Sequence, residues 1–362
     1  PYTGKALADD PVMALLIVSN EDEMFPRVLD SRYALPPGLR NDVQALWNRW
    51  LVERYGDRAK LVEAWKAMGA EPALSAAEDP VKGTVAIPET AHRGRIFDFR
   101  RFCAAVQRQF AQRMTSHLRS LGVQCPIQHT NHIYTPEGVF IMADADFSGI
   151  HLYGPYQDGI TYTVGNFSII KANNPLAGNL WHFPAAGLKG RLAGKPFVLG
   201  EWNVGYPNDF RGGGVMQGFA YGLLQDWDCI SYFCFFANPK LWQPDGPGVA
   251  TSLESAFDPA RAGLFPAIAL MFHRQDITPA KEAVHQRFAD ADIEALGKEK
   301  GYPAYVWPLT KDLAWIPFAH RYYLAPRPVD ETRGVALKGT GSELESAVQK
   351  LREAARRDGL ID

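Results

Sequence analysis

Five short apolar runs, each followed directly by polar residues, constrain the fold of this chain more than any other feature. Apolar strands of this length that alternate with helices are typical of a parallel sheet buried on both faces. The carboxyl ends of parallel strands meet at one edge of a sheet or one mouth of a barrel, where active sites form. The sequence therefore predicts an α/β fold with polar clusters gathered at that edge. The runs are residues 13–19, 123–130, 148–153, 196–200 and 229–236.

Segments with helical periodicity separate several of these runs. Apolar residues recur at helical spacing over residues 39–68, and Gly56 with Asp57 predicts a break between two helices. A second amphipathic segment covers residues 98–121, and Gly122 is predicted to end it. The other predicted helices are residues 217–225, residues 255–274 and, from a capping box at Ser342 and Glu345, a terminal helix to about residue 357.

The chain changes character after about residue 275. Residues 302–324 are rich in Trp, Tyr and Pro and are predicted to form hairpin strands ahead of the terminal helix. We therefore predict two regions: a catalytic part over residues 1–275 and a smaller appended region over residues 276–362.

The composition excludes several classes of partner. A formal net charge of -2 gives no electrostatic reason to bind nucleic acid or an acidic membrane surface. No run of 18 apolar residues is present, so we expect no transmembrane helix. We predict no cofactor and no metal ion. The four scattered cysteines are typical of buried free thiols rather than of a disulfide framework or a metal site. The 9 Trp, 14 Tyr and 20 Phe fit a carbohydrate cleft, but by themselves they are better explained by a large core with many rings.

Two glutamates each follow an apolar run directly. Glu21 comes after the run at residues 13–19, and Glu201 comes after the run at residues 196–200. Cleaving a glycosidic bond with retention needs two carboxyl groups about 5–5.5 Å apart, one to protonate the leaving oxygen and one to attack the sugar. Because the strand ends of one parallel barrel converge, the long stretch of chain between the two glutamates is no obstacle.

These residues resemble clan A of the glycoside hydrolases, in particular families 5 and 42. In that clan, which has a (β/α)8 TIM-barrel fold, an Asn and the acid/base end strand 4 and the nucleophile ends strand 7. Asn20-Glu21 and Glu201-Trp202 match those positions if the five runs are strands 4 to 8. Residues 47–65 also resemble the Trp-rich segment after strand 4 in family 42 β-galactosidases. The resemblance covers roughly residues 10–275 and implies a retaining glycoside hydrolase that acts on β-glycosidic bonds of an oligo- or polysaccharide.

The resemblance also assigns roles to residues near the strand ends. It implies that Glu21 is the acid/base, that Glu201 is the nucleophile and that Asn20 binds the sugar 2-hydroxyl. Tyr153, in a His-x-Tyr motif with His151, would hydrogen-bond the nucleophile. The predicted substrate-binding residues are Asn20, Asn131, His132, His151, Tyr153, Trp202, Tyr206 and Tyr232, with Trp242 a further stacking candidate and Phe233 the alternative to Tyr232 in place of a strand 8 Trp.

Other interpretations of the acidic residues stay open. Glu23 is an alternative acid, and Glu201 has the alternative role of a structural carboxylate paired to an arginine such as Arg211. The glycines at residues 212–214 are predicted to form a flexible turn rather than a phosphate-binding loop. A non-catalytic carbohydrate-binding protein on the same fold is the alternative to an enzyme.

A metal-dependent barrel hydrolase is a weaker alternative. His129 and His132, with Asp144 and Asp146 nearby, include residue types that bind divalent ions. However, His129 and His132 are three residues apart and would face opposite sides of a strand. We therefore favour hydrogen bonding of a sugar by Asn131 or His132.

Strands 1 to 3 of a barrel have no counterpart in this sequence before residue 10. An eight-stranded barrel cannot close on five strands, and its open edges would pair with other chains. We expect a second polypeptide or an upstream segment to supply these strands.

Overall fold

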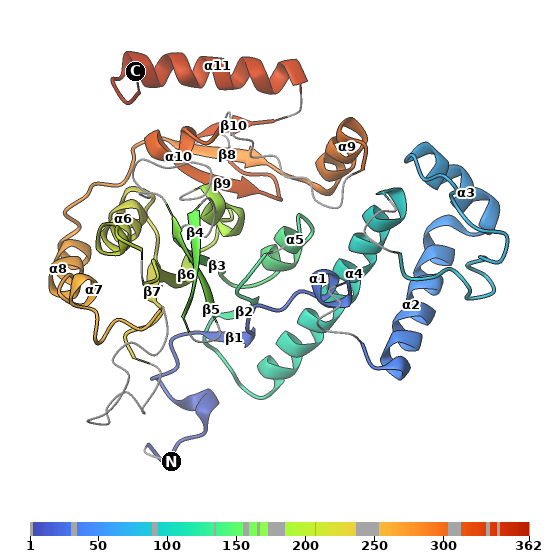
Figure 1. The fold of residues 1–362 in the computed structure, drawn as a ribbon, viewed down its shortest axis with the longest axis horizontal. Helices are drawn as coiled ribbons and strands as arrows, with labels where there is room; N and C mark the ends of the chain where they lie inside the picture. Colours follow the sequence, from blue (N-terminus) through green and yellow to red (C-terminus); the bar gives the residue numbers. More distant parts are fainter. Residues whose placement is uncertain are drawn as a thin grey trace. The chain divides into compact units, whose positions relative to one another are not determined.

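The computed structural model describes two compact units of mixed helix and strand (Figure 1). Unit 1 comprises residues 1–146 and 288–308, and unit 2 comprises residues 147–287 and 309–362. The boundary predicted after residue 275 falls inside unit 2 and stays a prediction. The described residues are 3–29, 35–88, 93–133, 135–154, 159–164, 167–172, 185–206, 208–236, 253–302, 313–330, 334–338 and 341–361.

Unit 1 combines one pair of parallel strands with a group of helices. The two strands pair so that Leu16 lies opposite Ile127 and Ser19 lies opposite Thr130. The elements of unit 1 are η1 (Leu7–Asp9), β1 (Leu16–Ser19), α1 (Met24–Leu29), α2 (Pro37–Tyr55), α3 (Arg58–Ala67), α4 (Arg93–Ser120), β2 (Ile127–Thr130), α5 (Gly138–Ala143) and α9 (Asp290–Lys300).

Aromatic packing joins α2, α3 and α4 within unit 1. Trp47 and Trp65 are fully buried, and their rings stack with centroids 6.2 Å apart. The ring of Phe99 from α4 meets Trp47 edge to face at 5.3 Å. Gly56, with φ +84°, ends α2 in a conformation that favours glycine, and the Asp57 side chain caps α3. The predicted helices and the break between them are therefore confirmed.

The described residues of unit 2 form three small sheets. The strands of the sheet β3-β6-β7 are all parallel, those of β10-β8-β9 are also parallel, and β4 and β5 form an antiparallel pair. Its elements are β3 (Ser148–Tyr153), β4 (Gly159–Val164), β5 (Phe167–Ala172), η3 (Ala185–Gly190), β6 (Phe197–Asn203), α6 (Arg211–Leu224), β7 (Cys229–Tyr232), α7 (Pro259–Ala262), α8 (Phe265–Arg274), β8 (Ala283–Arg287), α10 (Ile316–Ala319), β9 (Arg321–Ala325), β10 (Val335–Leu337) and α11 (Gly341–Arg357).

The core of unit 2 lies between β6 and the helices α6 and α8. Leu199 and Trp202 of β6 pack with Phe219 of α6 and Ile268 of α8 in one buried cluster. Gly218 lets α6 approach the sheet, because a Cβ at this position would lie 2.2 Å from Nε1 of Trp202. Burial of these large side chains supplies most of the stabilisation of such a layer.

Three predictions about unit 2 need correction. Residues 212–214 lie inside α6 rather than in a turn, and Gly212 is required there because a Cβ would lie 2.7 Å from the carbonyl oxygen of Ala260. The helix predicted over residues 255–274 is two helices, since Pro266 lacks the N–H that a continuous helix needs. In the described part of residues 302–324, β9 pairs in parallel with β8 instead of forming a hairpin.

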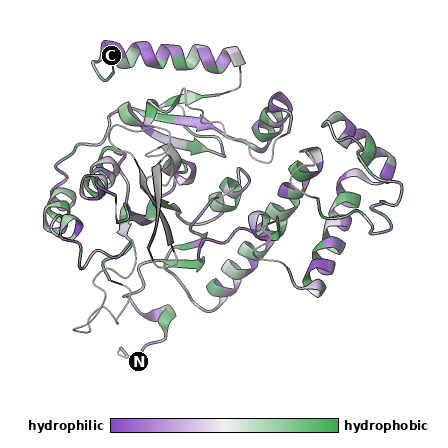
Figure 2. Ribbon diagram, in the orientation of Figure 1, coloured by the Kyte–Doolittle hydropathy of each residue, from purple (hydrophilic) through white to green (hydrophobic). Residues whose placement is uncertain are grey.

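The terminal helix α11 is amphipathic, as predicted. Val348, Leu351 and Ala355 are buried, and hydrophilic residues alternate with them along the helix (Figure 2). The helix begins at Gly341, so Ser342 lies inside it rather than at its cap. No helix in the described ranges has the length and apolar character needed to cross a bilayer.

Unit 2 contains a buried histidine whose protonation opposes folding. His320 is 2% exposed, and neither ring nitrogen has a hydrogen-bond partner among the residues described. Burial lowers the pKa of this imidazole below 6.5, although the carboxylates of Glu282 and Asp358 partly offset the effect. The unfolded chain therefore takes up this proton more readily, so stability falls as the pH drops through about 6.5.

We expect the melting temperature of the wild type to fall more steeply with acidification than that of the variant His320→Leu. The comparison is a thermal unfolding series between about pH 7.5 and about pH 5.5. Parallel falls in the two proteins would contradict this account of His320.

Candidate active site

A β-bulge in β6 sets the direction of Glu201. Ile150 of β3 lies opposite Leu199, but His151 lies opposite Glu201, so Gly200 is an extra residue in β6. The pairing with β7 shifts at the same place. As a result, Leu199 and Trp202 both enter the core although they are three residues apart. The bulge interrupts the regular alternation of side chains and turns Glu201 away from the core face.

Two side chains from the end of β3 converge on the carboxylate of Glu201. The hydroxyl of Tyr153 donates a hydrogen bond to Oε2 of Glu201. Nδ1 of His151 lies 3.3 Å from the same oxygen, and the His151 ring is buried. Gly200 makes room for this ring, since a Cβ there would lie 2.9 Å from both Cδ2 and Nε2 of His151. The structure thus brings His151 and Tyr153 together at the carboxylate of Glu201, and their roles toward a substrate stay predictions.

Phe233, rather than Tyr232, borders this cluster. The ring of Phe233 meets that of Tyr153 edge to face with centroids 6.3 Å apart, and Phe233 is 37% exposed. The hydroxyl of Tyr232 instead donates to Oδ1 of Asn203 at 2.9 Å, and its ring packs on Phe265. The hydrogen-bonding capacity of Tyr232 is thus used within the protein.

Asn203 is a functional candidate that sequence reasoning missed. Its side chain is fully buried two residues after Glu201 and uses all four of its hydrogen-bonding positions. Nδ2 donates to the carbonyl oxygens of Phe233, at 2.7 Å, and Leu253, at 2.6 Å. Oδ1 accepts from the Tyr232 hydroxyl and from Nη1 of Arg261 at 3.2 Å. Asn203 therefore fixes the backbone that carries Phe233, and the only signal in the sequence was an Asn close after a strand-end Glu.

The other predicted residues after β6 have different roles. Trp202 is 1% exposed in the core, so the prediction that its ring stacks on a sugar is wrong. Tyr206 is 36% exposed, and the guanidinium of Arg211 lies 5.3 Å from its ring centroid. Arg211 pairs with Asp258 at 2.6 Å, which argues against the alternative that Arg211 neutralises Glu201. Trp242 lies outside the described residues.

In unit 1, Asn131 organises the segment that carries Glu21. Oδ1 of Asn131 accepts a hydrogen bond from the backbone N–H of Glu21 at 2.6 Å, and Nδ2 donates to Oδ1 of Asn20 at 2.7 Å. Glu21 has a φ of +46°, a left-handed conformation that is uncommon for residues other than glycine. Asn20 is exposed directly after β1, and His132 is half-buried after β2. Asn131 thus connects the carboxyl ends of the two parallel strands.

Glu23 is held in a structural role. It is 3% exposed, and both carboxylate oxygens lie 3.1 Å from the backbone nitrogen of Thr135, whose hydroxyl also donates to Glu23. A buried carboxylate with these partners cannot easily reach a leaving group. These contacts favour Glu21 over Glu23 as the acid of this segment.

The histidine and acids of the metal alternative are also engaged within unit 1. Nε2 of His129 lies 3.0 Å from the Thr115 hydroxyl, and Nδ1 lies 3.2 Å from the carbonyl oxygen of Ile141. Asp144 pairs with Arg108, and Asp146 pairs with Arg119. These contacts do not favour a metal site at these residues.

Comparisons with known proteins give a similarity of fold. No protein-family model and no curated protein sequence matches this chain. A β-galactosidase from the psychrophilic Marinomonas ef1 is similar over 85% of this chain, at 16% identity and a TM-score of 0.50. This chain covers 50% of that β-galactosidase, so it spans about half of its length. PfGH50B is similar over 64% of this chain and 33% of its own, at 12% identity and a TM-score of 0.41.

Proposed function

We propose that this chain is the catalytic part of a retaining glycoside hydrolase that cleaves β-glycosidic bonds. The observation that carries the proposal is the bulged end of β6, where Glu201 receives a hydrogen bond from Tyr153 and has His151 beside it. A carboxylate oriented by a hydroxyl donor at the carboxyl end of a parallel strand fits a nucleophile. The similarity of fold to a β-galactosidase supports this interpretation.

The proposed reaction has two steps. Glu201 attacks the anomeric carbon while Glu21 gives its proton to the departing glycosidic oxygen, so a covalent glycosyl–enzyme forms and the C–O bond breaks. Glu21 then removes a proton from water, which attacks the anomeric carbon and releases Glu201. Asn20, next to Glu21, binds the sugar 2-hydroxyl. Phe233 and Tyr206 replace Trp202 as aromatic contacts for the sugar.

We further propose that β1, β2, β3, β6 and β7 are strands 4 to 8 of one (β/α)8 barrel. Parallel pairing within β1-β2 and within β3-β6-β7 supports this arrangement, and helical connections link β1 to β2 and β6 to β7. The remaining strands would come from an upstream segment or a second polypeptide.

The direct test is hydrolysis of a panel of aryl β-glycosides, with the configuration of the first-formed sugar followed by proton NMR. The proposal predicts initial release of the β-anomer, because two displacements preserve configuration. Initial release of the α-anomer would contradict it. Sugar binding without hydrolysis would favour a non-catalytic carbohydrate-binding protein.

Substitution of Gly200 tests the role of His151. Gly200→Ala places a methyl group against the His151 ring and should displace it from Glu201. We expect kcat/KM to fall by about 10²-fold, a loss typical of a catalytic group misplaced by about 1 Å. Gly213→Ala is the control, because a Cβ there meets no atom within 4 Å, and it should stabilise α6 by about 0.5–1 kcal/mol without affecting turnover. Equal activity of the two variants would contradict the role given to His151.

Substitution of Asn203 tests whether its hydrogen bonds position the backbone of Phe233. Asn203→Asp removes two donors and faces two carbonyl oxygens with a carboxylate, so we expect a loss of about 2–4 kcal/mol of unfolding free energy. Asn48 is a matched control in unit 1, since it is buried and its Nδ2 donates to the carbonyl oxygens of Gln44 and Val85.

Both variants should be destabilised in urea unfolding, but only Asn203→Asp should lower kcat of the folded protein, by about tenfold or more. A similar kcat for Asn203→Asp and Asn48→Asp, measured well below their unfolding midpoints, would show that Asn203 serves stability alone.

A further inference from the structure

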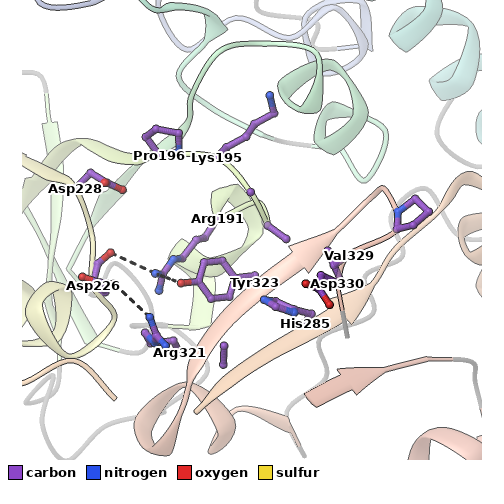
Figure 3. A pocket seen from close by; sticks show the side chains of 14 residues that line it. Arg191, Lys195, Pro196, Asp226, Asp228, His285, Arg321, Tyr323, Val329 and Asp330 are labelled. Carbon is purple, nitrogen blue, oxygen red and sulfur yellow. Dashed lines mark hydrogen bonds and ion pairs between the residues drawn. The ribbon is translucent and has the colours of Figure 1, made fainter. Parts of the chain in front are cut away.

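A cavity lies within unit 2, at the opposite end of the parallel strands from Glu201. It has a volume of about 720 Å³ and lies between the amino ends of β6 and β7 and one face of β8 and β9 (Figure 3). Pro196 directly precedes β6, and Asp228 directly precedes β7. The side chains that line it include Arg191, Asp226, Asp228, His285, Arg321 and Tyr323.

Positive charge is concentrated on the inner wall of this cavity. Arg191 is 2% exposed, its guanidinium lies 4.1 Å from the Tyr323 ring centroid, and its Nη2 donates to the Tyr323 hydroxyl at 2.9 Å. Arg321 and His285 extend from the adjacent strands β9 and β8. Burial lowers the pKa of Arg191, and the positive charge of Arg321 adds to this effect. The guanidinium groups of Arg191 and Arg321 thus line the same cavity, and they lie close enough together for their charges to repel each other.

Three buried side-chain nitrogens of the residues that line this cavity have no hydrogen-bond partner among the described residues. They are Nε of Arg191, Nε of Arg321 and Nδ1 of His285. Burial lowers the pKa of His285, and the charges of Arg321 and Arg191 lower it further. The terminal nitrogens of both guanidinium groups are bonded within the protein: those of Arg191 to Gln225 and Tyr323, and those of Arg321 to Asp226 and the carbonyl oxygen of Lys281. The Nε–H of each arginine is the donor that remains for a ligand.

The acidic residues of the cavity do not cancel this positive charge. Asp226, Asp228 and Asp330 are all exposed, so water screens their charges more strongly than the charge of the buried Arg191. Asp226 pairs with Arg321 at 3.3 Å, and the Asp228 carboxylate accepts the backbone N–H of Phe197 at 2.8 Å. The Asp226 carboxylate therefore pairs with the half-buried Arg321, whereas the buried Arg191 donates to the backbone carbonyl oxygen of Asp226 at 3.3 Å.

We propose that this cavity binds an oxyanion, a phosphate or sulfate group, held by Arg321, Arg191 and His285. The oxygens of such a group accept several N–H donors at once, and arginine suits them because its donors are fixed in a fork. In this proposal Arg191 and Arg321 turn their unbonded Nε–H groups toward the anion, and His285 donates from Nδ1 in the tautomer that carries its proton there. The cavity is large enough for an oxyanion carried by a sugar as well as for a free ion. This site is independent of the proposed chemistry at Glu201.

The test is isothermal titration of the intact chain with inorganic phosphate, inorganic sulfate and galactose 6-sulfate, with chloride holding the ionic strength constant. Uncharged galactose is the control for the sugar. Arg321→Gln removes the charge that faces His285. Arg274→Gln is the matched control, because Arg274 also forms an ion pair with an aspartate, Asp276 at 3.2 Å, but lies outside the cavity.

We expect saturable binding of at least one oxyanion to the wild type and to Arg274→Gln, and a Kd about tenfold or more weaker in Arg321→Gln. The histidine NMR signal lost in His285→Asn should shift with the same Kd. Tighter binding of galactose 6-sulfate than of sulfate would identify a sugar-borne anion, and equal binding would identify the free ion. Absence of saturable binding, or an unchanged Kd in Arg321→Gln, would overturn the proposal.

Discussion

Replacing Glu201 with alanine is expected to lower kcat by about 10⁴-fold or more, because the variant has no group to form the covalent intermediate. The fold should survive, since Glu201 lies beyond the bulge and outside the buried cluster of unit 2. Loss of turnover with an unchanged melting temperature is the expected pattern, measured by release of the aryl leaving group and by thermal unfolding.

Addition of azide tests whether Glu201 acts as the nucleophile. A small anion can occupy the space left by the carboxylate and attack the anomeric carbon once, which gives an α-glycosyl azide of inverted configuration. Glu282→Ala, at an exposed glutamate before β8, is the control and should behave as the wild type. A fully active Glu201→Ala variant would exclude Glu201 as the nucleophile.

Replacing Glu21 with alanine should have an effect that depends on the leaving group. Loss of a general acid costs about 10²–10⁴-fold for a substrate whose leaving oxygen needs a proton. A dinitrophenyl glycoside needs little protonation, so its first step should be much less affected. Azide should restore turnover of this substrate and give the β-glycosyl azide, because Glu201 still performs the first displacement. The measurement is kcat/KM across a series of aryl leaving groups.

Glu23→Ala distinguishes the two acids of this segment. Glu23 accepts hydrogen bonds from Thr135, so its removal should lower stability and leave the dependence on the leaving group unchanged. If Glu23→Ala showed the steep dependence and Glu21→Ala did not, the acid would be Glu23.

Much of the fold was predictable because the strands of this chain are short apolar runs that end abruptly. The strand over residues 148–153 has the predicted bounds, and the others differ by a few residues at their ends. The same pattern identified the strand ends that carry Glu21 and Glu201. The contact between Tyr153 and Glu201 followed from a resemblance of sequence motifs, not from periodicity.

The bulge in β6 was not predictable, and it explains the error at Trp202. Regular alternation would place Glu201 on the same side of the strand as the core residue Leu199, with Trp202 facing the site. The extra residue at Gly200 reverses this order. Bulges depend on pairing with neighbouring strands, which a single strand sequence does not encode.

Tertiary packing explains the other differences between the predicted and the observed structure. Three successive glycines are poor helix formers, but Gly212 allows α6 to approach the backbone at Ala260, so packing outweighs propensity. Likewise, the choice between Tyr232 and Phe233 depended on a buried polar network around Asn203. Such networks join residues that are distant in the sequence, and no local pattern reveals them.

The central claim is that Glu201 forms a covalent bond with the sugar during turnover. Dinitrophenyl 2-deoxy-2-fluoro-β-glycosides of galactose, glucose and mannose should trap this intermediate, and peptide mass spectrometry then locates the modified residue. We expect a single fluorosugar on the peptide that contains Glu201, and none in Glu201→Ala. A fluorosugar on any other residue of the active protein would contradict the claim.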